Sequence, residues 1–225
     1  MKDCLDNDNG ICVREEIELN GVTCPIIETE NLILKEINPD IINYAFQNLK
    51  DREIMNFLGF KALKELRLEK QRYEKGFTTW DISLKRWQLV ERASQEVVGI
   101  CGFHTWYINH FRAEVGYAIT DENYKRKGLM SEAFKRVIEF GFQEMNLNRI
   151  EAFISPDNVP SLEFIQKFGF IREGRLRQHY YKFNQAMDSI VYSFLRDDYI
   201  SSTNRATSVL KKTIQLIVPL SFDDE

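Results

Sequence analysis

A basic loop near the middle of the chain has the composition of a phosphate site. Residues 123–131 read Asn-Tyr-Lys-Arg-Lys-Gly-Leu-Met-Ser and stand between a strand-like run and an amphipathic helical run. The first N–H groups of a helix lack internal partners and lie at the positive end of its dipole, so they bind anions. Gly128 allows close approach of the backbone, and Lys125, Arg126 and Lys127 add positive charge. The loop predicts a pyrophosphate site; the alternative is a solvated basic turn before a surface helix.

A second motif, Asn158-Val159-Pro160-Ser161, follows a later strand-like run and begins a short helical stretch. The stretch ends near Gly169, which suits the left-handed residue that closes many helices. Taken alone, this motif predicts ordinary capping of the helix by Asp157 or Asn158.

The elements that must position these motifs are those of a mixed α/β chain. Short connections predict an antiparallel meander of three strands, at 87–93, 97–107 and 112–120. A helix at 129–145 follows, because Met130, Phe134, Ile138 and Phe142 recur every fourth position. The remaining predicted elements are a strand at 31–37, two helices from about 39 and at 61–75, a strand at 149–155, a helix at 158–168 and strands at 170–177 and 188–195. The fold class is therefore α/β (α+β) with a largely antiparallel sheet.

Both ends of the chain differ from this main body, residues 28–199. Residues 1–27 form an extension in which Asn20-Gly21 predicts a hairpin, since both residues tolerate positive φ. Residues 200–225 begin as a polar Ser/Thr/Asn linker, and alternation over 211–220 then predicts an added strand. That strand must pair with this sheet or with a second copy, which makes a homodimer an open alternative.

Composition restricts the class of protein. The net charge of −4 argues against non-specific nucleic-acid binding as the main activity. The sequence contains no run of ~18 apolar residues, so we expect no membrane span. The first ten residues lack the pattern of a secretory signal. The four cysteines form no Cys-x-x-Cys or zinc pattern, so we expect no metal and reduced thiols in the cytoplasm. A disulfide among Cys4, Cys12 and Cys24 stays open.

Residues 28–199 resemble the GNAT superfamily of N-acetyltransferases, and within it the RimJ/RimL-type ribosomal-protein branch. The similar stretches are 30–34, 98–102, 113–117, 124–133, 147–152, 158–161, 167–170 and 188–193. The resemblance implies a twisted, mostly antiparallel sheet with helices on both faces and a splayed strand pair that binds the cofactor.

The resemblance also implies acetyl-coenzyme A as cosubstrate. Backbone amides of the loop, including those of Leu129 and Met130, would bind its pyrophosphate. Lys125 stands where the family usually has Gln or Arg, Met130 replaces a small residue, and Arg126 stands where many relatives have glycine. The pantetheine arm would lie between strands 112–120 and 149–155, with the amides near Ile119.

Two residues of the second motif take family roles in the same way. Asn158 matches an asparagine that contacts the cofactor arm. Ser161 matches a serine that protonates the departing thiolate.

Glu114 is the first candidate for the base that collects the amine proton, and Glu151 on the partner strand is the second. The alternative for each is a strand glutamate that faces solvent or forms an ion pair. We expect His104, His110 and His179 to be packing or surface residues, although the strand position of His104 would let it line the acceptor pocket.

The expected activity is transfer of an acetyl group to a primary amine, first of all a protein N-terminus. The alternatives are a small-molecule amine (a polyamine, aminoglycoside, amino acid or amino-sugar) and a non-catalytic coenzyme A-binding protein. Segments 41–75 and 174–187 would build the acceptor site. We expect Glu53, Glu65, Glu69 and Glu74 to form a solvated helix face, because Lys and Arg are interspersed with them.

Overall fold

The computed structural model describes residues 13–19, 22–76, 78, 82–182 and 184–205. These residues belong to two compact units, Met1–Ala152 and Phe153–Glu225. Within the described residues, no helix is both long and apolar enough to cross a membrane.

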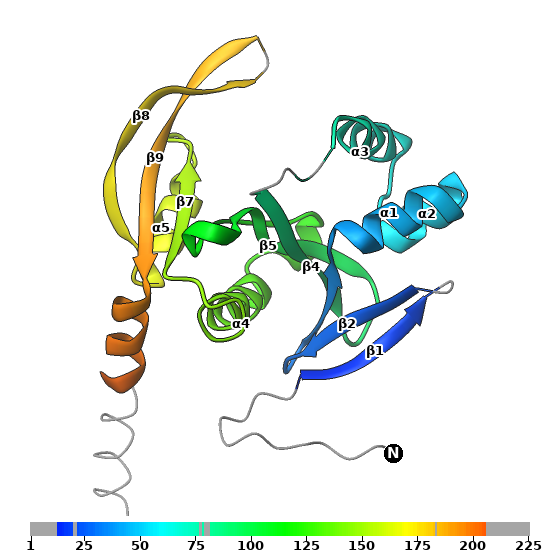
Figure 1. Ribbon diagram of the computed structural model, residues 1–225, viewed down its shortest axis with the longest axis horizontal. Coiled ribbons are helices and arrows are strands. Elements are labelled where there is room, and N and C mark those ends of the chain that lie inside the picture. The colour runs from blue at the N-terminus through cyan, green and yellow to red at the C-terminus, as the bar shows by residue number, and fades with distance from the viewer. Residues whose placement is uncertain (1–12, 20–21, 77, 79–81, 183, 206–225) are drawn as a thin grey trace, which may run out of the picture. The chain divides into compact units, whose positions relative to one another are not determined.

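The first unit contains a mixed sheet (Figure 1). Its strands, in spatial order, are β1 (Val13–Leu19), β2 (Val22–Glu28), β3 (Leu32–Ile37), β4 (Ile82–Glu91), β5 (Val97–Tyr107), β6 (Arg112–Ile119) and β7 (Arg149–Ile154). Neighbours pair antiparallel from β1 to β6, and β6 pairs parallel with β7. The expected antiparallel meander of β4, β5 and β6 is therefore confirmed, with β4 beginning five residues earlier than predicted.

The β1–β2 pair is the hairpin that Asn20-Gly21 predicts, with Leu19 opposite Val22. The two turn residues themselves lie outside the described residues. Cys24 on β2 and Cys101 on β5 are free, buried thiols, so Cys24 is in no disulfide; Cys4 and Cys12 lie outside the described residues.

Three helices, rather than the two expected, connect β3 to β4. They are α1 (Pro39–Asn48), α2 (Asp51–Leu58) and α3 (Leu63–Lys75). Asn38 caps α1 by accepting the Ile41 N–H at 3.0 Å, as its place before Pro39 predicts. The additional helix is α2, which is only eight residues long and ends at the left-handed Gly59.

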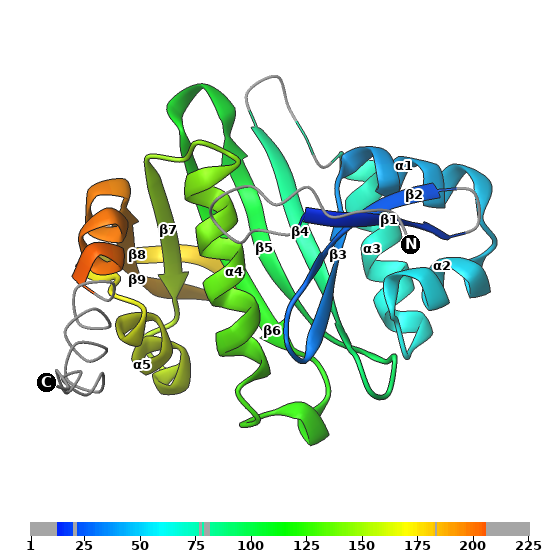
Figure 2. The same cartoon turned by 90° about the horizontal axis from the view of Figure 1, so that it is seen from below.

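Helices cover both faces of this sheet. Successive strand side chains point to opposite faces, and on β4 Arg86 reaches Glu69 of α3 while Trp87 packs edge-on against Phe140 of α4 (Leu129–Gln143). Figure 2 shows α4 running along the sheet over its central strands. The expected arrangement of helices on both faces is confirmed.

The apolar face of α4 forms much of the core. Phe134, Ile138 and Phe142 are buried as their spacing predicts, and Phe103 of β5 is fully enclosed beneath the helix at Gly141. Met130, at the start of the same face, is half-buried. The helix is thus fixed to the sheet by apolar burial, and its first turn is held in one place.

The second unit contains α5 (Val159–Lys167) and an antiparallel hairpin of β8 (Ile171–Lys182) and β9 (Gln185–Leu195). Ile190, Tyr192 and Phe194 alternate as the buried face of β9, whereas most of β8 is exposed.

The polar linker expected from residue 200 is wrong, because residues 196–205 are helical. The carboxylate of Asp198 accepts the Leu195 N–H at 3.1 Å, which caps the helix start. Ser202 and Thr203, the residues that suggested a linker, donate their hydroxyl hydrogens to the Tyr199 carbonyl inside the helix. The strand predicted at 211–220 lies outside the described residues.

Candidate active site

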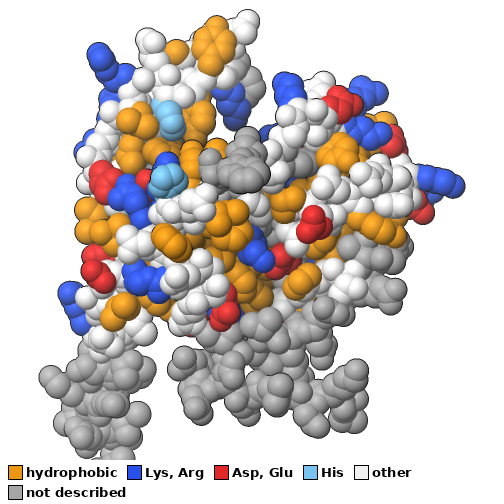
Figure 3. Space-filling model, viewed as in Figure 1, with side chains coloured by type: hydrophobic (Ala, Val, Ile, Leu, Met, Phe, Trp, Pro, Cys, Tyr) orange, Lys and Arg blue, Asp and Glu red, His pale blue; other side chains and the backbone are white. Residues whose placement is uncertain are grey.

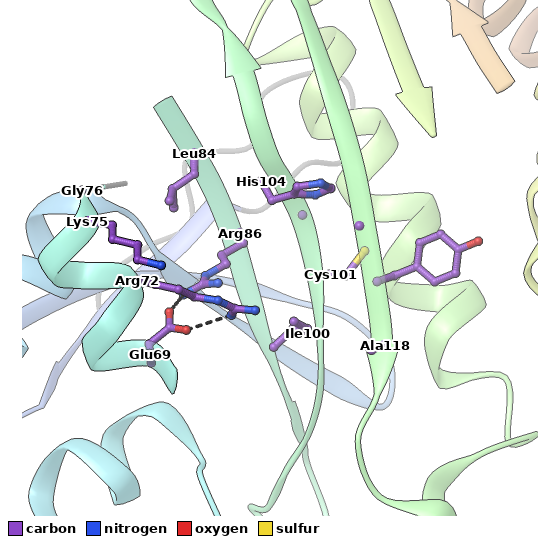
Figure 4. A pocket seen from close by; sticks show the side chains of 13 residues that line it. Glu69, Arg72, Lys75, Gly76, Leu84, Arg86, Ile100, Cys101, His104 and Ala118 are labelled. Atoms are coloured by element: carbon purple, nitrogen blue, oxygen red, sulfur yellow. Dashed lines mark hydrogen bonds and ion pairs between the residues drawn. The ribbon is translucent and has the colours of Figure 1, made fainter. Parts of the chain in front are cut away.

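A cavity of about 540 Å³ lies in the first unit between α3 and strands β4, β5 and β6 (Figure 4). Its lining comes from residues 100–102, His104 and residues 116–118 of the sheet, from Leu84 and Arg86 of β4, and from Glu69, Arg72 and Lys75 of α3. This volume is typical of sites for small ligands or for the end of a peptide.

His104 reaches the cavity because of an irregularity in β5. Phe103 is opposite Val115 and Thr105 is opposite Glu114, so His104 is an extra residue in a β-bulge. Bulges change the direction of a side chain at the point of insertion. The imidazole lines the cavity, and its Nε2 lies 3.0 Å from Oε1 of Glu114.

Glu114 lies behind His104 as seen from the cavity. The side chain of His104 is 46% exposed and that of Glu114 only 13% exposed. The carboxylate orients the imidazole, and an imidazole that lines a cavity is a side chain of the type that accepts a proton in general base catalysis.

Glu151, the second candidate base, forms two ion pairs instead. One of its oxygens accepts a hydrogen bond from Arg112 and the other accepts one from Arg149, each at 2.7 Å. The carboxylate is buried between the two guanidinium groups, and this is the ion-pair alternative that its place on a strand left open.

Cys101 also lines the cavity but is not a nucleophile there. Complete burial raises the pKa of its thiol far above the ordinary value. The sulfur therefore stays protonated at neutral pH, and the thiolate that attacks electrophiles does not form.

The edge of β6 beside the cavity diverges from its parallel partner. Pairing with β7 covers Arg112 to Glu114 of β6, while the strand itself continues to Ile119. The Thr120 N–H donates to Val98 of β5 at 2.9 Å. Because strand N–H groups alternate in direction, those of Tyr117 and Ile119 face away from β5, toward the diverging edge. A ligand can therefore bind along this edge as an additional strand would.

The predicted phosphate loop leads directly into α4. Gly128 is the N-cap residue, with φ +83, and no side chain caps the helix start. A Cβ atom at Gly128 would meet nothing within 4 Å, so the space beside this residue is open. Uncapped N–H groups at a helix start fit an anionic ligand.

The side chains of the loop divide between this open side and the core. Lys125, Arg126 and Lys127 are exposed, Met130 is half-buried and Leu129 is buried in the core. Leu129 therefore offers a ligand its backbone and not its side chain.

Ion pairs and hydrogen bonds hold the loop in place. Lys61 Nζ lies 2.6 Å from Asp121 Oδ2, a hydrogen bond that lowers the pKa of Asp121 and raises that of Lys61. At the other end, the carboxylate of Glu132 accepts both the backbone N–H and the side-chain N–H of Asn31, at 2.8 and 2.9 Å. The first turn of α4 is thereby joined to the start of β3.

In the second unit, Asn158 is the N-cap of α5. Its Oδ1 accepts the Ser161 N–H at 3.3 Å, while Ser161 itself is half-buried. The expected capping role of Asn158 is confirmed, and the cofactor roles of Asn158 and Ser161 stay predictions. Gly169, with φ +85, ends the helix region as its type predicts.

The charges on α3 differ from the expectation in one residue. Figure 3 shows Lys and Arg mixed with Asp and Glu over α2 and α3, as expected for a solvated surface, and Glu53, Glu65 and Glu74 are exposed. Glu69 is instead only 4% exposed, and its carboxylate pairs with Arg86 at 2.6 Å and with Arg72 at 3.0 Å. The spacing of Glu69 and Arg72 was visible in the sequence, whereas the approach of Arg86 depends on tertiary structure.

Among the residues that the structure describes, no group of three or more His, Cys, Asp or Glu side chains is placed to hold a metal ion.

The amino-acid sequence of this chain is similar to those of known proteins. A family profile described as an acetyltransferase (GNAT) domain matches residues 31–171. The uncharacterized N-acetyltransferase YoaA of Bacillus subtilis is 31% identical over 173 residues, which are 76% of this chain and 97% of YoaA.

Two solved structures share the fold. The ribosomal-protein-S5-alanine acetyltransferase of Vibrio fischeri aligns with a TM-score of 0.53 at 21% identity, over 77% of this chain and 97% of its own. The spermidine/spermine N-acetyltransferase SpeG of Vibrio cholerae aligns with a TM-score of 0.55 at 17% identity, over 76% and 96%. Since these two proteins are named for different acceptors, the fold alone does not determine the acceptor.

Proposed function

The chain belongs to the GNAT family of N-acetyltransferases, and we propose that it moves the acetyl group of acetyl-CoA onto the primary amine of a protein N-terminus bound in the cavity beside His104. The observation that carries this proposal is the His104–Glu114 pair, whose imidazole lines the cavity at the diverging edge of β6. The resemblance to the ribosomal-protein branch supports a protein N-terminus as the acceptor.

Acetyl-CoA supplies the acetyl group as a thioester, and the reaction forms an amide C–N bond while the C–S bond breaks. The attacking amine must lose a proton, and His104 is placed to take it. Glu114 acts as a positioning residue, because its carboxylate contacts His104 while His104, and not Glu114, is among the residues that line the cavity. The thiolate that leaves gains a proton, for which Ser161 is the proposed donor.

The binding features of the chain fit the parts of the cosubstrate. The open helix start at Gly128, with Lys125, Arg126 and Lys127, would hold the diphosphate. The backbone N–H groups of Tyr117 and Ile119 would bind the amide-bearing arm as a neighbouring strand does. Leu129 and Met130 would contribute their N–H groups, and Asn158 would contact the arm.

The second candidate function is acetylation of a small-molecule amine, which the same cavity volume also accommodates. The two functions share the thioester chemistry and differ in what surrounds the acceptor nitrogen.

Two measurements test the proposal. Isothermal titration calorimetry with acetyl-CoA should show binding at micromolar concentration, and mass spectrometry should show a gain of one acetyl group on members of a mixed panel of peptides and small amines. Acetylation of peptide N-termini with small amines unmodified supports the protein acceptor, and the reverse result supports the second function. Binding without acetylation of any amine would leave a coenzyme A-binding protein and overturn the catalytic assignment.

A further inference from the structure

The cavity is positively charged on the side formed by α3 and β4. Arg72 and Lys75 of α3 and Arg86 of β4 line it, and Glu69 is the one carboxylate among its lining residues that the structure describes. Figure 4 shows the ends of these three cationic side chains turned toward one another beside Glu69. Three cations face one anion, so the lining carries an excess of positive charge.

Glu69 does not exhaust the hydrogen-bonding capacity of its partners. Arg86 Nη2 lies 2.6 Å from one carboxylate oxygen and Arg72 Nη1 lies 3.0 Å from the other. A guanidinium group has five N–H donors, so both arginines keep donors for a ligand. The side chain of Arg72 is 57% exposed and therefore reachable from the cavity.

A neighbouring small cavity supplies a second observation. It measures about 100 Å³ and shares Glu69, Arg72 and Arg86 with the larger one. Gln88 also lines it, is 3% exposed, and has a buried Oε1 without a hydrogen-bond partner. Buried polar atoms are rarely unsatisfied, so this wall has a free acceptor that an N–H or O–H donor of a ligand, and not its anionic group, would satisfy.

From this wall we propose that the acceptor carries an anionic group, a carboxylate, close to its reactive amine. Arg72, Lys75 and Arg86 hold the anion, in the planar two-point manner that guanidinium groups allow, while the amine faces His104. The proposal rests on the proposed acetyl transfer and specifies its acceptor. The anionic group belongs either to a free amino acid or to a peptide with an acidic residue beside its N-terminus.

The same charges disfavour polycationic acceptors. A polyamine would bring several ammonium groups against Arg72, Lys75 and Arg86, and juxtaposed like charges weaken binding. The wall thus selects among amines by their charge.

The test compares matched acceptors at saturating acetyl-CoA. The free-molecule arm pairs glycine with glycinamide and alanine with alaninamide, the peptide arm pairs C-terminally amidated Ala-Glu with Ala-Gln peptides, and spermidine completes the panel. In whichever arm contains the acceptor, the carboxylate-bearing member should have a kcat/KM at least about tenfold above its neutral match. The arm that responds identifies the source of the anion.

Two variants connect this preference to the wall. R72Q, and independently K75Q, should raise KM for the anionic acceptor about tenfold and leave KM for its neutral match and for acetyl-CoA unchanged. The control is R67Q, which removes an exposed arginine from the same helix outside the cavity and should change nothing.

The outcomes separate this inference from the function on which it rests. Acetylation of neutral or polycationic amines in preference to anionic ones, or equal behaviour of R72Q and R67Q, overturns the anionic acceptor and leaves the acetyl transfer intact. Acetyl-CoA binding with no amine acetylated overturns both.

Discussion

His104 and Gly116 are in contact across the β5–β6 pair, and the contact is possible because Gly116 has no side chain. A Cβ atom at Gly116 would lie 2.8 Å from Nδ1 of His104, closer than van der Waals contact allows. G116A should therefore displace the imidazole from Glu114 and lower kcat about tenfold or more. Steady-state kinetics together with a thermal melt will check this, and an unchanged kcat in folded G116A would show that the position of His104 does not matter.

Loss of the proton acceptor itself should be more damaging. H104Q should lower kcat about a hundredfold, because general-base catalysis contributes at least that much, with acetyl-CoA affinity by calorimetry unchanged. E114Q should give a smaller loss of the same kind, since it acts through His104. H110Q, which changes an exposed histidine outside the cavity, is the control; equal turnover in H104Q and H110Q contradicts the assignment.

Gly128 should matter for the cosubstrate more than for folding. G128A forces an L-residue to φ +83, which costs about 1 kcal/mol and should lower Tm by about 3 °C. The altered loop should also bind acetyl-CoA about tenfold more weakly, or about 1.4 kcal/mol. G174A is the matched control, because Gly174 has equal space around it and an ordinary φ. A lower Tm with unchanged affinity would remove the diphosphate from this loop.

Substitutions at Ser161 and Asn158 should distinguish a role in catalysis from a role in capping α5. S161A keeps the backbone N–H that Asn158 accepts, so Tm should change by less than about 1 °C while kcat falls about tenfold. N158A removes the cap and should cost about 1 kcal/mol of stability. A fall in Tm for S161A with kcat unchanged would make Ser161 a structural residue.

Lys35 should make stability depend on pH in the alkaline range. It is 6% exposed and donates to the Phe57 carbonyl, and burial lowers its pKa to about 8 from 10.5. Between these values the unfolded chain binds more protons than the folded chain, so the free energy of unfolding rises with pH. Urea titrations at pH 7.5 and 9.5 should differ by about 2 kcal/mol from this group.

K35M should lose this contribution, while K64M, a change at an exposed lysine, should keep it. The idea fails if the two variants show the same change between the two pH values.

The sequence predicted best those elements whose pattern is local and strongly periodic. The bounds of β5 match the prediction at both ends, and α4 begins at Leu129 as expected. The sequence does not predict α2 as a separate helix. Its apolar pattern extends over only eight residues, which is too short to distinguish it from the helices on either side. The sequence predicts a linker from residue 200, because Ser202 and Thr203 favour turns. In the structure their hydroxyls instead donate to a carbonyl within a helix.

The candidate site also divides into features with a local sequence pattern and features that depend on tertiary structure. Gly128 and its basic neighbours are contiguous in sequence, and so they were found. His104 and Glu114 come together only through the bulge in β5, and Glu69 is buried only because Arg86 reaches it from β4. Register irregularities and contacts between distant segments leave no periodic signal in one sequence. The proposed proton acceptor and the charged wall could therefore be identified only from the structure.

The two hydrogen bonds from Asn31 to Glu132 bear on the free energy with which the proposed cosubstrate would bind. They join segments 101 residues apart, so the turn proposed to hold the diphosphate loses its conformational entropy when the protein folds and not when a ligand binds. The nucleotide end of the proposed cosubstrate would therefore meet a preorganised surface, and its affinity would reflect direct contacts with little loss to ordering of the chain.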